Sequence, residues 1–364
     1  MSEDQFIVFT YPSLVNDLKL FMENYQYSLP IIPPDEPRRK FTPINKRLCR
    51  FCGKDSSATT FRTDAHIIPQ LLGNKYLVSD YECDKCNSLF SAYESNLTES
   101  LGAYRTVFNI PGRKNKVPKY TSPGDGLVAS PNSDLNIPHA ITIEDNTGTS
   151  FEIDDKTGNT VISYTKNGFV PLLAYKALLK IALTLIDEKD VSSYSEAFKF
   201  LMSDVYDEKC AEVAHVHQFF GSYRSRSHCY LFKMINPAAR LPTHIFQLYF
   251  ENIVFQLFIP FNSNDKNIYD SEPVSVLMCP PIFYTPVTES VPNHTEIRNW
   301  TSRERTWKKG SFKMTIDAES LKHASALNPI TGEEVKNYLF DPNNIVKMVL
   351  VPAGTTLPIK KKKD

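Results

Sequence analysis

The 364-residue sequence lacks any apolar run of about 18 residues free of charged side chains, which is the length that a membrane-spanning helix requires. Its first five residues include two acidic side chains and lack the basic-then-apolar order of a secretory signal. Charge of one sign is not in excess, because 41 Lys and Arg balance 41 Asp and Glu. These absences predict a cytoplasmic protein without a membrane partner, and they exclude a uniformly basic coat protein.

Cysteine is scarce, with seven residues, and an odd number in a chain without an export signal argues against a disulfide framework. Four of the seven form two Cys-x2-Cys pairs, Cys49 with Cys52 and Cys83 with Cys86. Two such pairs can present four thiolates to one tetrahedral ion, and a closed shell of four ligands is typical of structural zinc. We therefore predict one structural Zn²⁺ bound by these four cysteines.

Proline and charge patterns predict how the chain is divided. Residues 30–44 contain five prolines and a short basic run, and proline at this density suppresses both helices and central strands. We expect an α+β protein with the following segments: an N-terminal helix and basic linker (1–44), a zinc-containing domain (45–108), a basic loop and small β-meander (109–165), a larger α+β domain (166–355) and a basic tail (356–364).

The region from Val170 to Ile186 is apolar almost all round, as expected of a buried helix. Lys176, Lys180 and Thr184 interrupt it at intervals of four residues, so they share one face. This spacing predicts a buried helix with one narrow solvated stripe.

Further along the chain the periodicity changes from helical to strand-like. A pattern typical of a capping box, Ser193-x-x-Glu196, predicts the start of a second helix. Later apolar and β-branched runs predict strands over residues 229–235, 244–250, 253–259 and 274–279.

A histidine and an asparagine lie close in sequence to the paired cysteines. His66 precedes Ile-Ile-Pro, which predicts a position at the end of a strand, and Asn87 directly follows the second pair at the start of a helix. The zinc would hold the two segments together, an arrangement suited to a general base opposite a metal ion. The alternatives for His66 are a zinc ligand or a core histidine, and four cysteines that already close the zinc shell argue against the first.

The combined motifs resemble the HNH endonuclease family, in its subgroup with four zinc-binding cysteines. The resemblance covers about residues 47–105 and includes Ala-His-Ile-Ile-Pro, Leu-Gly-Asn, Glu-Cys-Asp-x-Cys-Asn and Phe-x-x-x-Glu. It implies a ββα-metal fold, in which a two-stranded ribbon and a helix hold a divalent ion. It also implies that His66 activates water, that Asn87 binds a catalytic Mg²⁺ or Mn²⁺, and that Asn74 pins the loop between the strands.

One position departs from the family pattern. Many members carry a metal-binding side chain immediately before the base, where this sequence has Ala65. Asp64 shares a strand face with His66 at a period of two and is the expected replacement. Glu94 lies two helical turns from Asn87 and is the alternative. If neither carboxylate replaces the missing ligand, the ion is weakly held or the domain is inactive.

Charge supports a polyanionic substrate such as DNA. Residues 38–120 contain 15 Lys and Arg against 7 Asp and Glu, a surplus of 15 − 7 = 8 positive charges. Each basic side chain can neutralise one phosphate. The candidate phosphate contacts are Arg50, Lys54, Arg62, Arg113, Lys114 and Lys116.

These observations predict a metal-dependent DNA endonuclease whose C-terminal region senses a signal, sets specificity or binds a partner. By analogy of layout alone, such a protein is similar to restriction or anti-phage defence effectors. The alternative is a non-catalytic, zinc-dependent DNA-binding protein. Zinc nucleobase deaminases are excluded because the residue two after His66 is not glutamate. A regulatory protein, a signal ligand and a homo-oligomer remain open as partners.

Overall fold

The structure is a computed structural model, and its described elements form two compact units, each built from two stretches of chain. Unit 1 comprises Met1–Thr98 and Phe169–Thr306, and unit 2 comprises Glu99–Gly168 and Trp307–Asp364. This division differs from the sequence-based segments, because the stretch that carries the four paired cysteines clusters with the region after residue 168. The structure describes residues 8–28, 39–41, 47–112, 116–133, 137–154, 159–203, 212–217, 227–269, 274–283, 286, 294–315, 326–327, 334–335, 347–351 and 355.

Unit 1 contains a six-stranded antiparallel sheet in the order β1-β11-β12-β13-β10-β14. Every residue of β12 and β13 is buried, so the centre of the sheet is covered on both faces. Three of the predicted strands are confirmed, whereas residues 274–279 form no strand. The strands are β1 (Tyr25–Tyr27), β10 (Glu212–His217), β11 (His228–Met234), β12 (His244–Phe250), β13 (Ile253–Phe258) and β14 (His294–Asn299).

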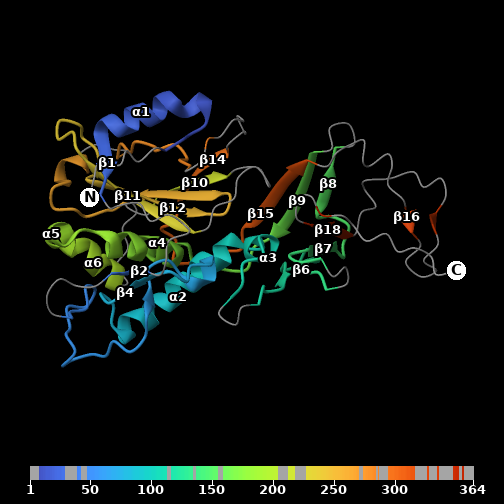
Figure 1. Cartoon of the computed structure of the whole chain (residues 1–364), viewed down its shortest axis with the longest axis horizontal. Coiled ribbons are helices and arrows are strands. Elements are labelled where there is room, and N and C mark those ends of the chain that lie inside the picture. Colours follow the sequence, from blue (N-terminus) through green and yellow to red (C-terminus); the bar gives the residue numbers. More distant parts are fainter. Residues whose placement is uncertain are drawn as a thin grey trace. The chain divides into compact units, whose positions relative to one another are not determined.

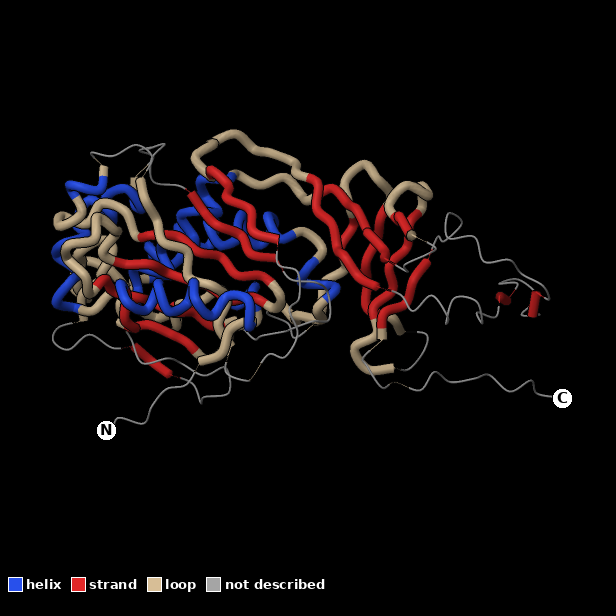
Figure 2. The backbone as a smooth tube through the Cα atoms, turned by 90° about the horizontal axis from the view of Figure 1, so that it is seen from above, coloured by secondary structure: helices blue, strands red, loops and turns tan. Residues whose placement is uncertain are grey.

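Helices cover this sheet on its two faces (Figures 1 and 2). On one face, Phe21 of α1 packs against Phe232 with ring centroids 5.0 Å apart. On the other face, the Tyr194 hydroxyl lies 2.7 Å from Nδ1 of His244. Helix α6 begins at Ser195, and its N-cap residue Tyr194 makes no side-chain hydrogen bond, so the predicted capping box at Ser193 is wrong. The elements are α1 (Val15–Asn24), α4 (Pro171–Leu185), α5 (Glu188–Val191), η3 (Ser192–Tyr194) and α6 (Ser195–Met202).

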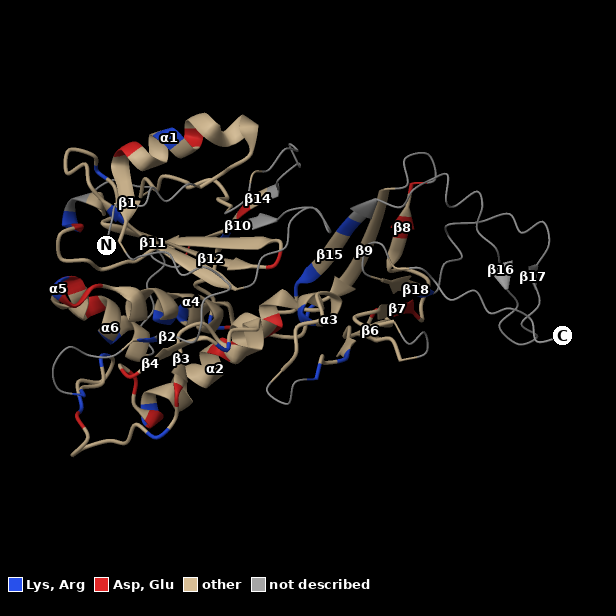
Figure 3. Cartoon of the chain, in the orientation of Figure 1, with Lys and Arg blue, Asp and Glu red and all other residues tan. Residues whose placement is uncertain are grey.

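The apolar helix α4 confirms the predicted helix, but its polar stripe is not solvated. Lys176, Lys180 and Thr184 are each at most 1% exposed, and Figure 3 shows blue segments on the α4 ribbon. The expectation was wrong because protein atoms replace the water: the Lys176 ammonium donates to the carbonyl of Ser203, and Thr184 donates to the carbonyl of Lys180. None of the described helices, α4 included, combines the length and apolar composition that a bilayer crossing requires.

The stretch of unit 1 that carries the four paired cysteines folds as two short strands followed by a long helix. Strand β3 (Ala65–His66) pairs antiparallel with β4 (Leu77–Ser79), and α2 (Asp84–Leu101) follows. A third strand, β2 (Arg39–Phe41), pairs parallel with the other edge of β4. This ββα order and the mixed sheets confirm the predicted α+β class.

Arg50 connects the first cysteine pair to the end of α4. Its guanidinium donates to the carbonyls of Thr184 at 2.7 Å and Ile186 at 2.9 Å, and it pairs with Glu188 at 2.7 Å. It also stacks over the ring of Tyr81, 3.9 Å from the ring centroid. The last carbonyls of a helix lack intrahelical partners and carry partial negative charge. Arg50 therefore caps α4 from a distant part of the sequence.

The described part of unit 2 contains two larger antiparallel sheets, a separate two-stranded pair and the short helix α3 (Tyr104–Val107). The predicted β-meander is not one meander, because β7 pairs with β6 and β18 while β8 pairs with β9. One sheet has the order β15-β9-β8 and the other β18-β7-β6-β5. Their bounds are β5 (Tyr120–Thr121), β6 (Leu127–Pro131), β7 (Ile141–Asp145), β8 (Phe151–Ile153), β9 (Asn159–Thr165), β15 (Lys309–Thr315) and β18 (Lys347–Leu350); β16 (Ala326–Leu327) and β17 (Glu334–Val335) form a separate pair.

We expect Arg50→Met to lower the free energy of unfolding by about 2 kcal/mol, because several charge-assisted hydrogen bonds at the end of α4 are lost. Urea unfolding measures the change. Lys54→Met is the matched control, since Lys54 is exposed in the same segment and should change stability by less than about 0.5 kcal/mol. Equal stability of the two variants would contradict a capping role for Arg50.

Candidate functional site

The four paired cysteines gather at one point of unit 1. Sγ of Cys49 lies 3.7 Å from Sγ of Cys86, and Sγ of Cys52 lies 3.8 Å from Sγ of Cys83. All four sulfur atoms lie within 4.8 Å of one another. A tetrahedron with Zn–S bonds of ~2.3 Å has sulfur–sulfur edges of ~3.8 Å. The donor set and its spacing therefore fit a closed structural zinc site.

The backbone around the first cysteine pair shapes this cluster. The amide of Gly53 donates to the carbonyl of Cys49, and the amide of Cys49 donates to the carbonyl of Lys54. Gly53 has a φ of 68°, which is readily adopted by glycine. From the second pair, the amide of Cys83 donates to Sγ of Cys49 at 3.4 Å. The contact between Cys83 and Cys49 joins the two cysteine pairs directly.

The loop between β3 and β4 is organised around Asn74, which is 3% exposed. Its amide nitrogen donates to the carbonyls of Ile68 at 2.7 Å and Leu77 at 3.1 Å. Its amide oxygen accepts from the backbone of Tyr76 and Leu77, each at 3.0 Å. One side chain thus ties both ends of the loop together, which fixes the position where β3 ends.

His66 is the last residue of β3 and is half-buried. Its Nδ1 atom is buried, and the side-chain nitrogen of Gln70 lies 2.7 Å from its Nε2. Gln70 begins the short helix η2 (Gln70–Leu72), directly after the Ile-Ile-Pro sequence. The imidazole is therefore oriented by a neighbour four residues along the chain, outside the four-sulfur cluster.

Asp84 fixes the segment that leads into β3. The carboxylate of this first residue of α2 accepts from the Thr60 hydroxyl at 2.5 Å and from the amides of Arg62 at 3.0 Å and Thr63 at 2.9 Å. The Thr60 hydrogen bond is the main cause that lowers the pKa of Asp84 to about 2. The start of α2 and the approach to His66 are thus joined by a charged acceptor.

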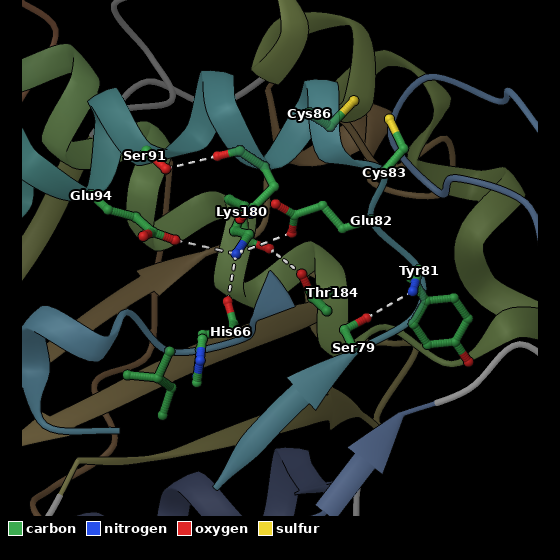
Figure 4. Close-up of polar contacts among 12 residues, drawn as sticks. His66, Ser79, Tyr81, Glu82, Cys83, Cys86, Ser91, Glu94, Lys180 and Thr184 are labelled. Carbon is green, nitrogen blue, oxygen red and sulfur yellow. Dashed lines mark hydrogen bonds and ion pairs between the residues drawn. The ribbon is translucent and has the colours of Figure 1, made fainter. Parts of the chain in front are cut away.

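A buried ammonium lies beside His66. Nζ of Lys180 is 2.8 Å from the carbonyl oxygen of His66, 3.2 Å from Glu82 and 3.3 Å from Glu94 (Figure 4). Burial opposes the charge on Lys180, but the two carboxylates outweigh it and raise its pKa. Burial also raises the pKa of Glu82 to about 7, and Lys180 acts in the opposite direction. In Figure 4 the imidazole of His66 points away from the ammonium.

The residues considered for a catalytic ion lie around the end of β3 and the start of α2. Ala65 is fully buried, whereas Asp64 is exposed and immediately precedes β3. Asn87 is half-buried in the first turn of α2. Glu94 is ion-paired with Lys180, so we do not assign it to a metal site. Within the described part of the chain, the cysteines form the one group of three or more His, Cys, Asp or Glu side chains placed to hold a metal.

The basic residues predicted to contact DNA differ in their surroundings. Lys54 and Arg62 are exposed in unit 1, and Lys116 is exposed in unit 2. Arg113 and Lys114 lie outside the described residues. Arg50 requires a correction, because its side chain is 4% exposed and caps α4, which leaves it unsuited to a phosphate contact.

Sequence reasoning missed Gln70, Asp84 and Lys180 as residues that position the site. Lys180 did carry a signal, since a lysine in the middle of an almost wholly apolar helix requires a buried partner. Its partner could not be identified, because Lys180 and His66 are far apart in the sequence. Gln70 and Asp84 carried no signal, since polar residues near turns and helix starts are ordinary.

We expect natively purified protein to contain one zinc ion per chain and Cys49→Ser to lose it. Structural zinc contributes directly to folding free energy, so this variant should also unfold the segment around β3, β4 and α2. Elemental analysis and far-ultraviolet circular dichroism measure the two effects. Cys229→Ala is the matched control, because Cys229 is buried in β11 outside the cluster, and it should retain the zinc. Wild-type protein free of zinc would contradict the assignment.

Comparison with known proteins agrees with this geometry. Residues 49–100 match the family model described as HNH endonuclease. No curated protein and no solved structure matches the chain. The matched stretch contains both cysteine pairs, β3, β4 and nearly all of α2, and it ends before α4 begins. The N-terminal part of this protein is therefore an HNH endonuclease domain with a four-cysteine cluster.

Proposed function

We propose that the protein is a metal-dependent endonuclease that hydrolyses phosphodiester bonds of DNA. The observation that carries this proposal is the placement of His66. It ends a short strand of the ββα segment, it is not part of the four-cysteine cluster, and both its backbone and its ring contact other residues. A histidine that is not needed for the zinc and is held in a fixed orientation is suited to act on a substrate.

His66 is proposed as the general base that takes a proton from the attacking water. Because Nδ1 is buried, Nε2 is the nitrogen assigned to accept that proton. An amide of Gln70 that donates to Nε2 keeps this nitrogen unprotonated in the resting state. Imidazole is the side chain best suited to exchange a proton near neutral pH. Asn74 supports the base indirectly by fixing the loop after it.

Asn87 and Asp64 are the residues proposed to hold a catalytic Mg²⁺ or Mn²⁺. An amide oxygen and one exposed carboxylate fit an open site, because Mg²⁺ usually keeps several waters and binds one or two carboxylates together with substrate phosphates. When bound, such an ion polarises the scissile phosphate and stabilises the leaving oxygen. The zinc at Cys49, Cys52, Cys83 and Cys86 is proposed as purely structural, since four thiolates leave no open position.

DNA binding is proposed for the exposed basic residues of both units. Lys54 and Arg62 lie in the zinc-containing stretch, close in sequence to the cysteines and His66. Lys116, with Arg113 and Lys114 of the same basic run, would add contacts from unit 2. Each such residue can neutralise one phosphate, so affinity should fall steeply with salt.

The remainder of the chain is proposed to control the nuclease by binding a regulatory protein or a signal ligand. The support is architectural: the matched stretch ends at residue 100 of 364, and the sheet and helices of unit 1 are far larger than a zinc-binding ββα motif needs. A restriction or anti-phage role in the cytoplasm, with assembly into a homo-oligomer, agrees with that layout by analogy alone.

A non-catalytic, zinc-dependent DNA-binding protein is the second candidate. Ala65 favours it, because this fully buried methyl group stands where many HNH enzymes carry a metal ligand. Plasmid cleavage with Mg²⁺ or Mn²⁺, with EDTA as the control, separates the two functions. Binding without cleavage under both ions would favour the second candidate.

We expect His66→Ala to lower the cleavage rate by on the order of 10²–10⁴-fold, which is typical of the loss of a general base. Zinc content and DNA affinity should stay near those of the wild type, since His66 is not part of the cysteine cluster. Single-turnover nicking of plasmid, with affinity from gel shifts, measures both. A variant that cleaves at more than a few per cent of the wild-type rate would remove His66 from the role of base.

We expect Asp64→Asn to raise the Mg²⁺ concentration needed for half-maximal cleavage, and Mn²⁺ to restore part of the activity. The reason is that the amide removes the charge that the proposed open site supplies to the ion. Asp17→Asn is the matched control, because Asp17 is an exposed carboxylate on α1. A metal titration of cleavage rate compares the variants, and an unchanged curve for Asp64→Asn would exclude this ligand.

A further inference from the structure

Lys180 is a fully buried cation that belongs to α4, outside the stretch that matches the HNH family. Three oxygens lie within 3.3 Å of its ammonium: the His66 carbonyl and one carboxylate oxygen each from Glu82 and Glu94. The contacts with His66 and Glu94 are hydrogen bonds, and Glu82 adds an ion pair. Among these three oxygens, the His66 carbonyl is the one neutral acceptor, and its distance of 2.8 Å from Nζ is the shortest (Figure 4).

We propose that Lys180 is a positioning residue for His66, and that α4 is therefore an integral part of the nuclease site. This inference rests on the proposed function. Lys180 touches neither substrate nor the reacting atoms; it acts by holding the backbone from which the imidazole projects. The HNH domain of this protein would then depend on a helix that follows the matched stretch by 70 residues (171 − 101 = 70 intervening positions).

The strand that carries His66 is short, which makes an additional restraint important. β3 pairs with β4 through two residues only, Ala65 with Ser79 and His66 with Val78. The next restraint along the chain is the amide of Ile67, which donates to the carbonyl of Leu77 at 3.0 Å. A two-residue ladder frays easily, so a charge-assisted hydrogen bond from Lys180 contributes strongly to the placement of His66.

The same ammonium also restrains the two segments that hold the metals. Glu82 immediately precedes the zinc ligand Cys83, and Glu94 lies on α2, two turns after Asn87. Lys180 thus contacts the zinc-binding segment, the helix proposed to bind the catalytic ion and the strand that carries the base. An error of ~1 Å in such a placement can cost ~10²-fold in rate, even from a residue far from the chemistry.

Lys176 offers a comparison within the same helix. It lies one turn before Lys180 and is also buried, at 1% exposure. Its ammonium donates to the carbonyl of Ser203 and lies 4.9 Å from the ring centroid of Phe200. These two contacts are with α6 or the residue that follows it, and a longer one, 5.9 Å to the ring centroid of Tyr93, is with α2. Lys176→Met therefore removes a buried lysine of α4 without touching the His66 segment.

The first test compares the kinetics of Lys180→Met and Lys176→Met with those of the wild-type protein. We expect Lys180→Met to lower kcat for plasmid cleavage by on the order of 10–100-fold, with KM for DNA within threefold of the wild type. Lys176→Met should change neither value by more than threefold. A purely structural effect would lower the active fraction of both variants alike, so equal losses in the two would overturn the proposal.

A charge-balanced variant covers the case in which Lys180→Met fails to fold. Removing Lys180 leaves the buried carboxylate of Glu82 and the half-buried carboxylate of Glu94 without their cation, which is costly. Lys180→Met combined with Glu82→Gln removes this imbalance, and zinc content and thermal unfolding verify the fold. This double variant should show the same loss of kcat. If it cleaves within threefold of the wild type, Lys180 does not position His66.

Hydrogen exchange supplies a readout that does not require cleavage. Backbone amides of residues 65–68 and 77–79 should exchange at least tenfold faster in Lys180→Met than in Lys176→Met, because the restraint on His66 is lost. Unchanged exchange would overturn the inference even if the wild type cleaves DNA. If the exchange difference is present but no wild-type cleavage occurs with Mg²⁺ or Mn²⁺, the proposed function fails while the Lys180 contact stands.

Discussion

A cation that is removed from water needs opposite charge or hydrogen-bond acceptors around it, and at Lys180 this constraint joins α4 to the stretch that carries the four cysteines. The ammonium is fully buried, and its compensating charge comes from Glu82 and Glu94 of that stretch. Breaking a buried pair by removing one partner typically costs 3–5 kcal/mol. Helix α4 and the HNH domain are therefore held in one arrangement, with His66 at the point of contact. A small shift of α4 would lengthen the contacts of Lys180 with two carboxylates and one carbonyl, which apolar packing alone would not penalise in the same way.

Local chemistry in the sequence predicted the parts of the site that depend on near neighbours. The two Cys-x2-Cys pairs predicted a zinc site, and the four sulfur atoms do gather at tetrahedral spacing. The periodicity of the apolar residues also predicted α4 and three strands of the large sheet. What failed was the solvated stripe on α4. Periodicity identifies the face on which Lys176 and Lys180 lie, but it carries no information on what covers that face.

Contacts between distant segments could not be predicted for the same reason. Arg50 was expected to bind phosphate, because a basic residue beside a zinc ligand in a basic segment fits that role. Its actual partners are carbonyls at the end of α4, more than a hundred residues away. The division of each unit into two stretches of chain could not be predicted either. In unit 2, β15 pairs with β9 and β18 pairs with β7, although the paired strands are far apart in the sequence. Only the assembled fold brings these residues together.

The interrupted course of the chain has a consequence for the order in which the protein is made. On the ribosome, both cysteine pairs and His66 are synthesised before any part of α4, because unit 2 residues from Glu99 to Gly168 come between them. The four cysteines can gather in the nascent chain, yet Glu82 and Glu94 then lack the cation that lies between their carboxylates. The contact between Lys180 and the His66 carbonyl can form only after Lys180 has left the exit tunnel. During translation, the contact between Lys180 and the segment of His66 therefore forms later than the contacts among residues 49–100.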